Sequence, residues 1–227
     1  MPSMGMQAAS FFWTEMIYSL IIIICSLMIY FGTKELYELS SHKGIKYFRQ
    51  AFLFFALAYF FRSTIKLFLN YFGLKHAFDI MPKFFVGPLA LFVFMYFISM
   101  AIFYLVYSVL RKKLDPDSPR IFLFHFLALI MAIISIVFRS PFTHIVVNTL
   151  LLLFVAYAVY ISYRDQKSKK GINLYIIYLL LMFFSILNIL DLLIPTPLYF
   201  IQVIIYSASS FIFLLILYKV LKKTGGN

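Results

Sequence analysis

Seven long apolar stretches separated by short polar gaps are the feature that most constrains this chain. They cover residues 11–32, 46–72, 84–110, 121–138, 142–162, 172–193 and 198–220. A helix needs roughly 20 residues to cross a hydrocarbon layer of about 30 Å. Backbone groups find no water inside a bilayer, so each stretch is expected to be helical. The sequence therefore predicts an all-α integral membrane protein, a seven-transmembrane-helix bundle.

Composition agrees with this prediction and leaves little room for anything else. Apolar residues make up 64% of the chain and charged residues only 12%, whereas a soluble domain carries about a quarter charged residues. With 227 residues, there is space for the seven helices and their connections. We therefore expect residues 1–227 to form a single membrane domain.

The fourth stretch is the least certain span. Residues 121–138 form the shortest of the seven and are followed directly by Arg139, Ser140 and Pro141. Residues 121–162 can be two tightly connected spans or a broken helix pair that does not cross fully. We favour two spans, because Pro141 does not fit within a continuous helix.

Lysine and arginine residues are concentrated in alternate gaps. Most of the 20 lie after the first, third, fifth and seventh stretches: Lys34, Lys43, Lys46, Arg49, Arg111, Lys112, Lys113, Arg120, Arg164, Lys167, Lys169, Lys170, Lys219, Lys222 and Lys223. Cytoplasmic loops carry this excess, so the N-terminus is predicted outside and the C-terminus in the cytoplasm of a cell membrane crossed several times. We expect these cations to face anionic lipids at the cytoplasmic face, with no nucleic-acid partner.

The cytoplasmic gaps are too short for a signalling or catalytic domain. They comprise residues 33–49, 111–120 and 163–171. The first is expected to extend the first helix and to break near Gly44. It fits an interfacial hairpin with aromatic residues at headgroup depth. A docking site for a cytoplasmic protein partner on these loops is the alternative.

Polar residues within the spans gather at one depth, near the outer side. Arg62 and Lys66 are four residues apart and share a helix face, and polar residues of other spans lie at a similar level. We expect an outward-facing cavity whose ligand-binding residues are Arg62, Lys66, Glu15, Asp191, Asn188, Arg139, Gln202 and Tyr206. Cations outnumber anions in this set, which favours a small anionic or zwitterionic ligand.

Structural explanations for the same residues stay open. Long cationic side chains near helix ends can reach the interface without binding a ligand. Arg62 is deeper than Lys66, so a structural ion pair with Glu15 or Asp191 is the other simple explanation.

No cofactor, metal or catalytic chemistry is indicated. The histidines His42, His76, His125 and His144 lie at different depths and lack metal-ligand spacing. A retinal pigment needs a lysine in the middle of the last helix, but Lys219 is at its cytoplasmic end. The carboxylates of the spans belong to no catalytic motif. We therefore expect no cofactor and no enzymatic activity.

Two function classes fit these observations. A sensor or receptor-like protein would bind a small polar or anionic ligand in the cavity. A small-solute or ion transporter or channel would use the same cavity as its outer vestibule, with the first and last three spans as parallel repeats. A transport path needs polar positions in the inner halves, which offer few such groups, among them Ser26, Ser99 and His125. The sequence therefore favours the binding protein.

Overall fold

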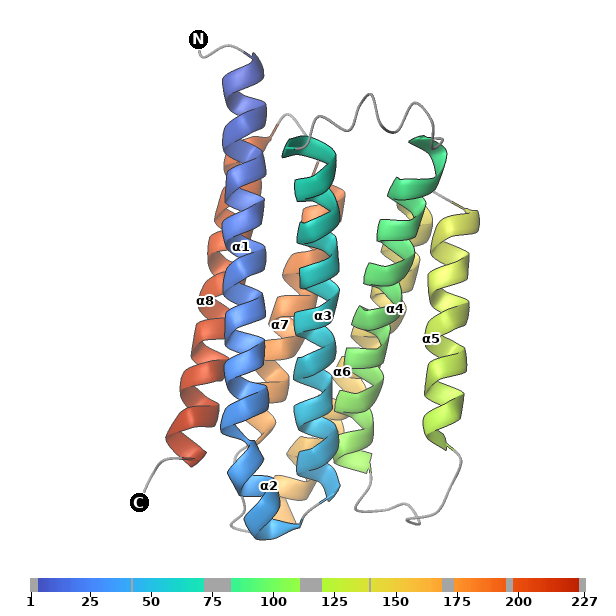
Figure 1. The fold of residues 1–227 in the computed structure, drawn as a ribbon. Helices are drawn as coiled ribbons and strands as arrows, with labels where there is room; N and C mark the ends of the chain where they lie inside the picture. Colours follow the sequence, from blue (N-terminus) through green and yellow to red (C-terminus); the bar gives the residue numbers. More distant parts are fainter. Residues whose placement is uncertain are drawn as a thin grey trace.

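The computed structural model describes residues 4–41, 43–71, 83–110, 120–138, 140–168, 174–194 and 198–224, and within these ranges every regular element is an α-helix (Figure 1). The helices are α1 (Met4–Gly32), α2 (Lys34–Ser40), α3 (Lys43–Tyr71), α4 (Lys83–Leu110), α5 (Arg120–Val137), α6 (Pro141–Ser168), α7 (Leu174–Leu193) and α8 (Tyr199–Thr224). The predicted all-helical fold is confirmed, with one long helix for each apolar stretch.

Six helical segments are long and apolar enough to cross a membrane, which makes this a multi-pass membrane protein. They are Phe12–Leu39, Lys43–Phe68, Gly87–Leu110, Pro141–Arg164, Tyr175–Leu193 and Phe200–Lys222. The apolar part of α5, Ile121–Val137, is shorter than these. The count of seven spans therefore stays a prediction, because residues 121–138 are the segment for which the sequence allowed incomplete crossing.

Six of the long helices form a closed ring. Neighbours along the ring are α1, α3, α4, α6, α7 and α8, and α8 returns to contact α1. Helix α5 lies outside this ring and packs mainly on α4 (Figure 1). The helices alternate in direction, so one end of the bundle carries the N-terminus and the other carries α2 and the C-terminal end of α8.

Aromatic side chains fill the centre of the ring. Phe52 and Phe55 of α3, Phe184 of α7 and Phe213 of α8 are buried and form what we call the aromatic cluster. Its closest pair, Phe184 and Phe213, has ring centroids 4.6 Å apart at an interplanar angle of 70°. Edge-to-face packing of this kind stabilises neighbouring helices where lipid removes the hydrophobic driving force.

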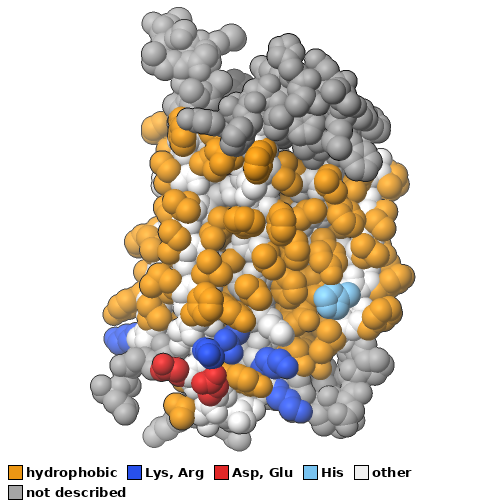
Figure 2. Space-filling view, in the orientation of Figure 1, with side chains coloured by type: hydrophobic (Ala, Val, Ile, Leu, Met, Phe, Trp, Pro, Cys, Tyr) orange, Lys and Arg blue, Asp and Glu red, His pale blue; other side chains and the backbone are white. Residues whose placement is uncertain are grey.

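The outside of the bundle is a broad apolar surface. Figure 2 shows hydrophobic side chains covering most of the visible face, with charged side chains gathered near α2. Large side chains such as Phe122, Phe142 and Phe200 are strongly exposed. In a membrane protein this surface contacts lipid.

The predicted helix break near Gly44 is present but lies slightly earlier in the chain. Helix α2 ends at Ser40, Ser41 is its C-cap with a left-handed φ of 50°, and Gly44 lies in the first turn of α3. The Ser41 N–H donates to the carbonyl of Tyr37 at 2.8 Å, so this conformation caps the last turn of α2. The expected helical extension of α1 exists as α2, set off at Thr33, whose hydroxyl donates to the Ile29 carbonyl at 2.7 Å.

Candidate functional site

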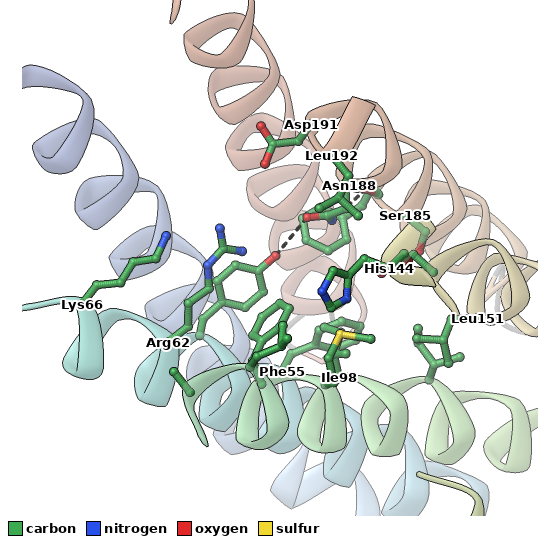
Figure 3. A pocket seen from close by; sticks show the side chains of 18 of the residues that line it. Phe55, Arg62, Lys66, Ile98, His144, Leu151, Ser185, Asn188, Asp191 and Leu192 are labelled. Carbon is green, nitrogen blue, oxygen red and sulfur yellow. Dashed lines mark hydrogen bonds between the residues drawn. The ribbon is translucent and has the colours of Figure 1, made fainter. Parts of the chain in front are cut away.

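A cavity of about 380 Å³ lies between α3, α4, α6 and α7. This volume falls in the range of small-molecule sites in proteins. Figure 3 shows polar side chains from three helices around one space. The polar lining residues are Arg62, Lys66, His144, Asn148, Ser185, Asn188 and Asp191.

A buried carboxylate holds the two cations of α3 that line the cavity. Arg62 Nη2 lies 2.6 Å from Glu15 Oε1, and Lys66 Nζ pairs with the same oxygen. The side chain of Glu15 is 7% exposed, that of Arg62 22% and that of Lys66 42%. Two cations on one acceptor compensate the cost of burying the carboxylate. The ion pair considered from the sequence is therefore present, and it joins α1 to α3.

A tyrosine network extends from this ion pair to α7 and α8. Tyr18 and Tyr59 share a hydrogen bond of 3.0 Å between their hydroxyls, and Tyr59 donates to Asn188 Oδ1 at 3.3 Å. Tyr18 also stacks on Tyr206, with ring centroids 4.8 Å apart. Tyr206 donates to Asp191 Oδ2 over a long 3.4 Å. Four helices thus fix the polar side of the cavity.

Two buried polar atoms of the lining have no hydrogen-bond partner among the described residues. They are Asp191 Oδ1 and His144 Nδ1. Buried polar atoms are nearly always satisfied, because an unmade hydrogen bond costs about 1–3 kcal/mol. Both side chains belong to the cavity wall. The wall therefore presents polar groups that nothing in the described bundle satisfies.

The cavity ends at the aromatic cluster. Phe55 and Phe184 belong both to the cluster and to the cavity wall. Below the polar groups the wall is apolar, with Met95, Ile98 and Ile102 of α4 facing the same space. The rings of Phe52 and Phe213 continue the closure, since both side chains are fully buried.

The structure brings together half of the predicted site residues in the cavity wall itself. Arg62, Lys66, Asn188 and Asp191 line it. Glu15 and Tyr206 support these residues from α1 and α8 without belonging to the wall. Gln202 is buried on α8 but is not a wall residue. Arg139 lies outside the described residues.

Sequence reasoning missed Tyr59 as a member of this site. A tyrosine in an apolar span resembles a packing residue. Tyr59 precedes Arg62 by three positions and therefore shares its helix face. This spacing could have predicted that Tyr59 belongs to the site. His144 also lines the cavity, and its Nδ1 has no partner among the described residues.

The described charges of the site balance one another. Arg62 and Lys66 are matched by Glu15 and Asp191. No group of three or more His, Cys, Asp or Glu side chains in the described part of the chain could hold a metal ion. The arrangement is suited to non-covalent binding of a small molecule.

Comparison with known proteins places the chain in a family. No protein-family model matches it, and no solved structure matches it significantly. An uncharacterized protein of Archaeoglobus fulgidus is 32% identical over 219 residues, which cover 94% of this chain and 93% of that protein. Similarity of this extent runs through the whole helical bundle. The chain therefore belongs to the same protein family as this archaeal protein.

Proposed function

We propose that this protein is a receptor-like or sensory protein of the cell membrane that binds a small polar ligand in its cavity. The excess of Lys and Arg near the α2 end supports a cytoplasmic location for that end. The N-terminal end, and the cavity with it, would then face outward. Seven spans are part of this proposal, with α5 crossing at the edge of the ring.

The observation that carries the proposal is a cavity with polar walls and a closed floor. Arg62, Asn188 and Asp191 converge on a space of about 380 Å³, and the aromatic cluster lies beneath it. A binding site needs convergent polar groups in a mostly apolar pocket. A permeation path would additionally need polar positions through the aromatic cluster. This contrast favours binding over passage.

A transporter is the second candidate, and one observation favours it. The ring consists of two consecutive three-helix halves, α1–α3–α4 and α6–α7–α8, whose helices run in matching directions (Figure 1). The cavity lies between α3 and α4 of one half and α6 and α7 of the other. Parallel repeats around a central site are a known transporter design. Passage would require the aromatic cluster to separate.

The α2 end fits contacts with anionic lipid and with a cytoplasmic output partner. Lys34 and Glu38 form an exposed pair at 3.8 Å, and Leu39 is 89% exposed beside them. Arg49 donates to the carbonyl of Tyr30 at 3.0 Å and lies over its ring. Cationic side chains beside an exposed apolar side chain are typical of the lipid headgroup region.

A cavity-blocking variant provides the test. Gly87 lines the cavity, and a Cβ placed there meets no atom within 4 Å. A side chain can therefore start at this position, and Gly87→Phe is chosen to place a ring in the cavity. Leu89→Phe, at a 47% exposed position on the same helix, is the matched control. The probes are n-hexylammonium, hexanoate, hexanol and glycine, which cover cation, anion, neutral and zwitterion.

Binding is measured by the shift of thermal unfolding in detergent and by calorimetry. We expect at least one probe to bind saturably to the wild type and to Leu89→Phe, with affinity at least tenfold lower in Gly87→Phe. The proposal fails if no probe binds or if Gly87→Phe binds as well as the control. Uptake of the bound probe into proteoliposomes would select the transporter instead.

A further inference from the structure

We infer that the ligand of this cavity carries an ammonium group, which Asp191 binds, and an apolar body that lies on the lower wall. This inference rests on the proposed binding function and specifies the chemistry of its ligand. It differs from the anionic ligand that the sequence favoured, and the difference comes from how the charges are paired.

The cations of the site are already engaged. Both Arg62 and Lys66 pair with Glu15, whose side chain is buried. An anionic ligand would therefore share Arg62 and Lys66 with a carboxylate that already holds a charge-assisted contact of 2.6 Å. Both cations keep further N–H donors, but each already has a carboxylate counter-charge in the described geometry. An anion would gain less from them than from an unpaired cation.

Asp191 is the charged group of the wall that has no ion-pair partner among the described residues. Its Oδ2 accepts one long hydrogen bond from Tyr206 at 3.4 Å, and its Oδ1 has no partner among the described residues. A carboxylate accepts several hydrogen bonds, and an ammonium group supplies three donors. A ligand ammonium would satisfy the buried oxygen and pair its charge.

The neutral polar groups of the wall are partly engaged within the bundle. Asn148 and Asn188 each donate one of two amide hydrogens to the carbonyl four residues earlier in their own helix, at 2.8 and 3.0 Å, so they serve a ligand donor and a ligand acceptor alike. Ser185 uses its hydroxyl hydrogen in the same way, at 2.9 Å. His144 Nδ1 is unpartnered and accepts a hydrogen bond when the imidazole is protonated at the other nitrogen.

The lower wall of the cavity indicates the chemistry of the ligand beyond its ammonium group. Met95, Ile98, Ile102 and Leu151 line it together with the rings of Phe55 and Phe184. These side chains offer no polar partner except the weak acceptor of Met95. At roughly 30 Å³ for each water-sized group, the cavity holds on the order of ten non-hydrogen atoms. A protonated amine with a short apolar chain matches this space.

The test compares head groups on one tail. n-Hexylammonium, hexanoate and hexanol share six carbons, so their partition into detergent through the tail is matched, and glycine tests the need for a tail. All four are titrated by calorimetry at pH 7, where an alkyl amine is protonated like a lysine side chain. We expect n-hexylammonium to bind at least tenfold more tightly than any of the others.

Two variants connect this preference to Asp191. Asp191→Asn removes the charge and should reduce the affinity for n-hexylammonium at least tenfold, to about that for hexanol. Tyr206→Phe removes the hydroxyl that donates to Asp191 while the charge stays, so affinity should be kept or increased. Affinity in Asp191→Asn equal to that of the wild type would overturn the inference.

The ranking of the four probes by their affinity for the wild-type protein tests the ammonium ligand without any variant. Tighter binding of hexanoate, sensitive to Gly87→Phe, would leave the proposed binding function intact and refute the ammonium ligand. Tighter binding of glycine would refute the apolar body. Absence of binding for all four probes would refute both the inference and the proposed function.

Discussion

The two ends of the bundle use the same helices in opposite ways. Toward the N-terminal end, α3 and α7 enclose a cavity, and Asp191 Oδ1 and His144 Nδ1 lack partners among the described residues. Toward the α2 end, the same helices are filled by aromatic rings. Ser108 and Tyr178 share a hydrogen bond of 2.7 Å between two buried side chains there, although Ser26 Oγ and Gln50 Oε1 have no partner among the described residues. The difference between the two ends therefore lies in packing and in charged groups rather than in complete hydrogen bonding.

This difference indicates where stability and function reside. A filled interior favours a single packing arrangement. A cavity with unsatisfied polar atoms costs stability and is retained where a ligand provides the missing contacts. Substitutions in the packed α2 end and in the buried ion pair should therefore change folding, whereas substitutions of wall residues without an ion pair should change binding.

The largest effect is expected in the aromatic cluster. Phe213 is fully buried, and its ring lies 4.6 Å from that of Phe184. Phe213→Ala should lower the free energy of unfolding by about 3 kcal/mol, because it leaves a large void. Thermal unfolding and denaturant titration in detergent measure this. Phe211→Ala, at a 61% exposed position on the same helix, should change it little; equal losses in both variants would contradict the two-region comparison.

The buried ion pair should give the next largest effect. Glu15→Gln leaves Arg62 and Lys66 without their counter-charge. We expect a loss of about 2 kcal/mol, below the roughly 3–5 kcal/mol of fully buried pairs, since Lys66 is partly exposed. Adding Arg62→Gln should recover part of it. The control is Glu38→Gln in the exposed pair with Lys34, which should be nearly neutral; a comparable loss there would argue against a special role for burial.

A smaller effect is expected at the satisfied hydroxyls. Ser108→Ala leaves the buried hydroxyl of Tyr178 without the partner it has in the structure. An unsatisfied buried group of this kind costs about 1–2 kcal/mol. The double variant Ser108→Ala with Tyr178→Phe should be more stable than Ser108→Ala alone, as measured by the same unfolding titration. Strict additivity of the two losses would mean that the hydrogen bond contributes nothing.

The smallest stability effect should come from the cavity wall. Asp191→Asn removes a buried charge whose one described hydrogen bond is long. Relief of that charge offsets the weakened contact, so the free energy of unfolding should change by less than about 1 kcal/mol. A loss as large as that of Glu15→Gln would make Asp191 a structural residue and weaken the distinction between the two ends.

The helices and the depth of the polar residues within the spans were predictable from the sequence. Runs of apolar residues give the seven long helices, and the spacing of Arg62 and Lys66 places both on one face. Both interpretations of these cations describe the structure, since they form an ion pair with Glu15 and also line the cavity. The sequence posed an ion pair and a cavity lining as alternatives, whereas the same side chains do both.

The remaining features depend on three-dimensional packing. No periodicity in the sequence reveals that α5 lies outside the ring or that α8 closes it against α1. The break between α2 and α3 lies slightly before Gly44, because Ser41 takes the left-handed conformation that ends α2; the sequence pointed to Gly44, since glycine is the usual residue there. Gln202 shares its depth with the site but lies outside the cavity wall, because depth does not specify direction around a helix.

Accessibility of the cavity from each side of the membrane tests the central claim most directly. Ser185→Cys in a Cys25→Ala background places one thiol in the cavity wall, since Cys25 is the sole cysteine of the chain and is itself buried. Labelling by a small, membrane-impermeant methanethiosulfonate is compared in right-side-out and inside-out vesicles. Our account predicts fast labelling only in right-side-out vesicles, because the aromatic cluster closes the end of the cavity that we propose to face the cytoplasm. Equal labelling from both sides, or labelling from the cytoplasmic side alone, would contradict a closed, outward-facing binding site.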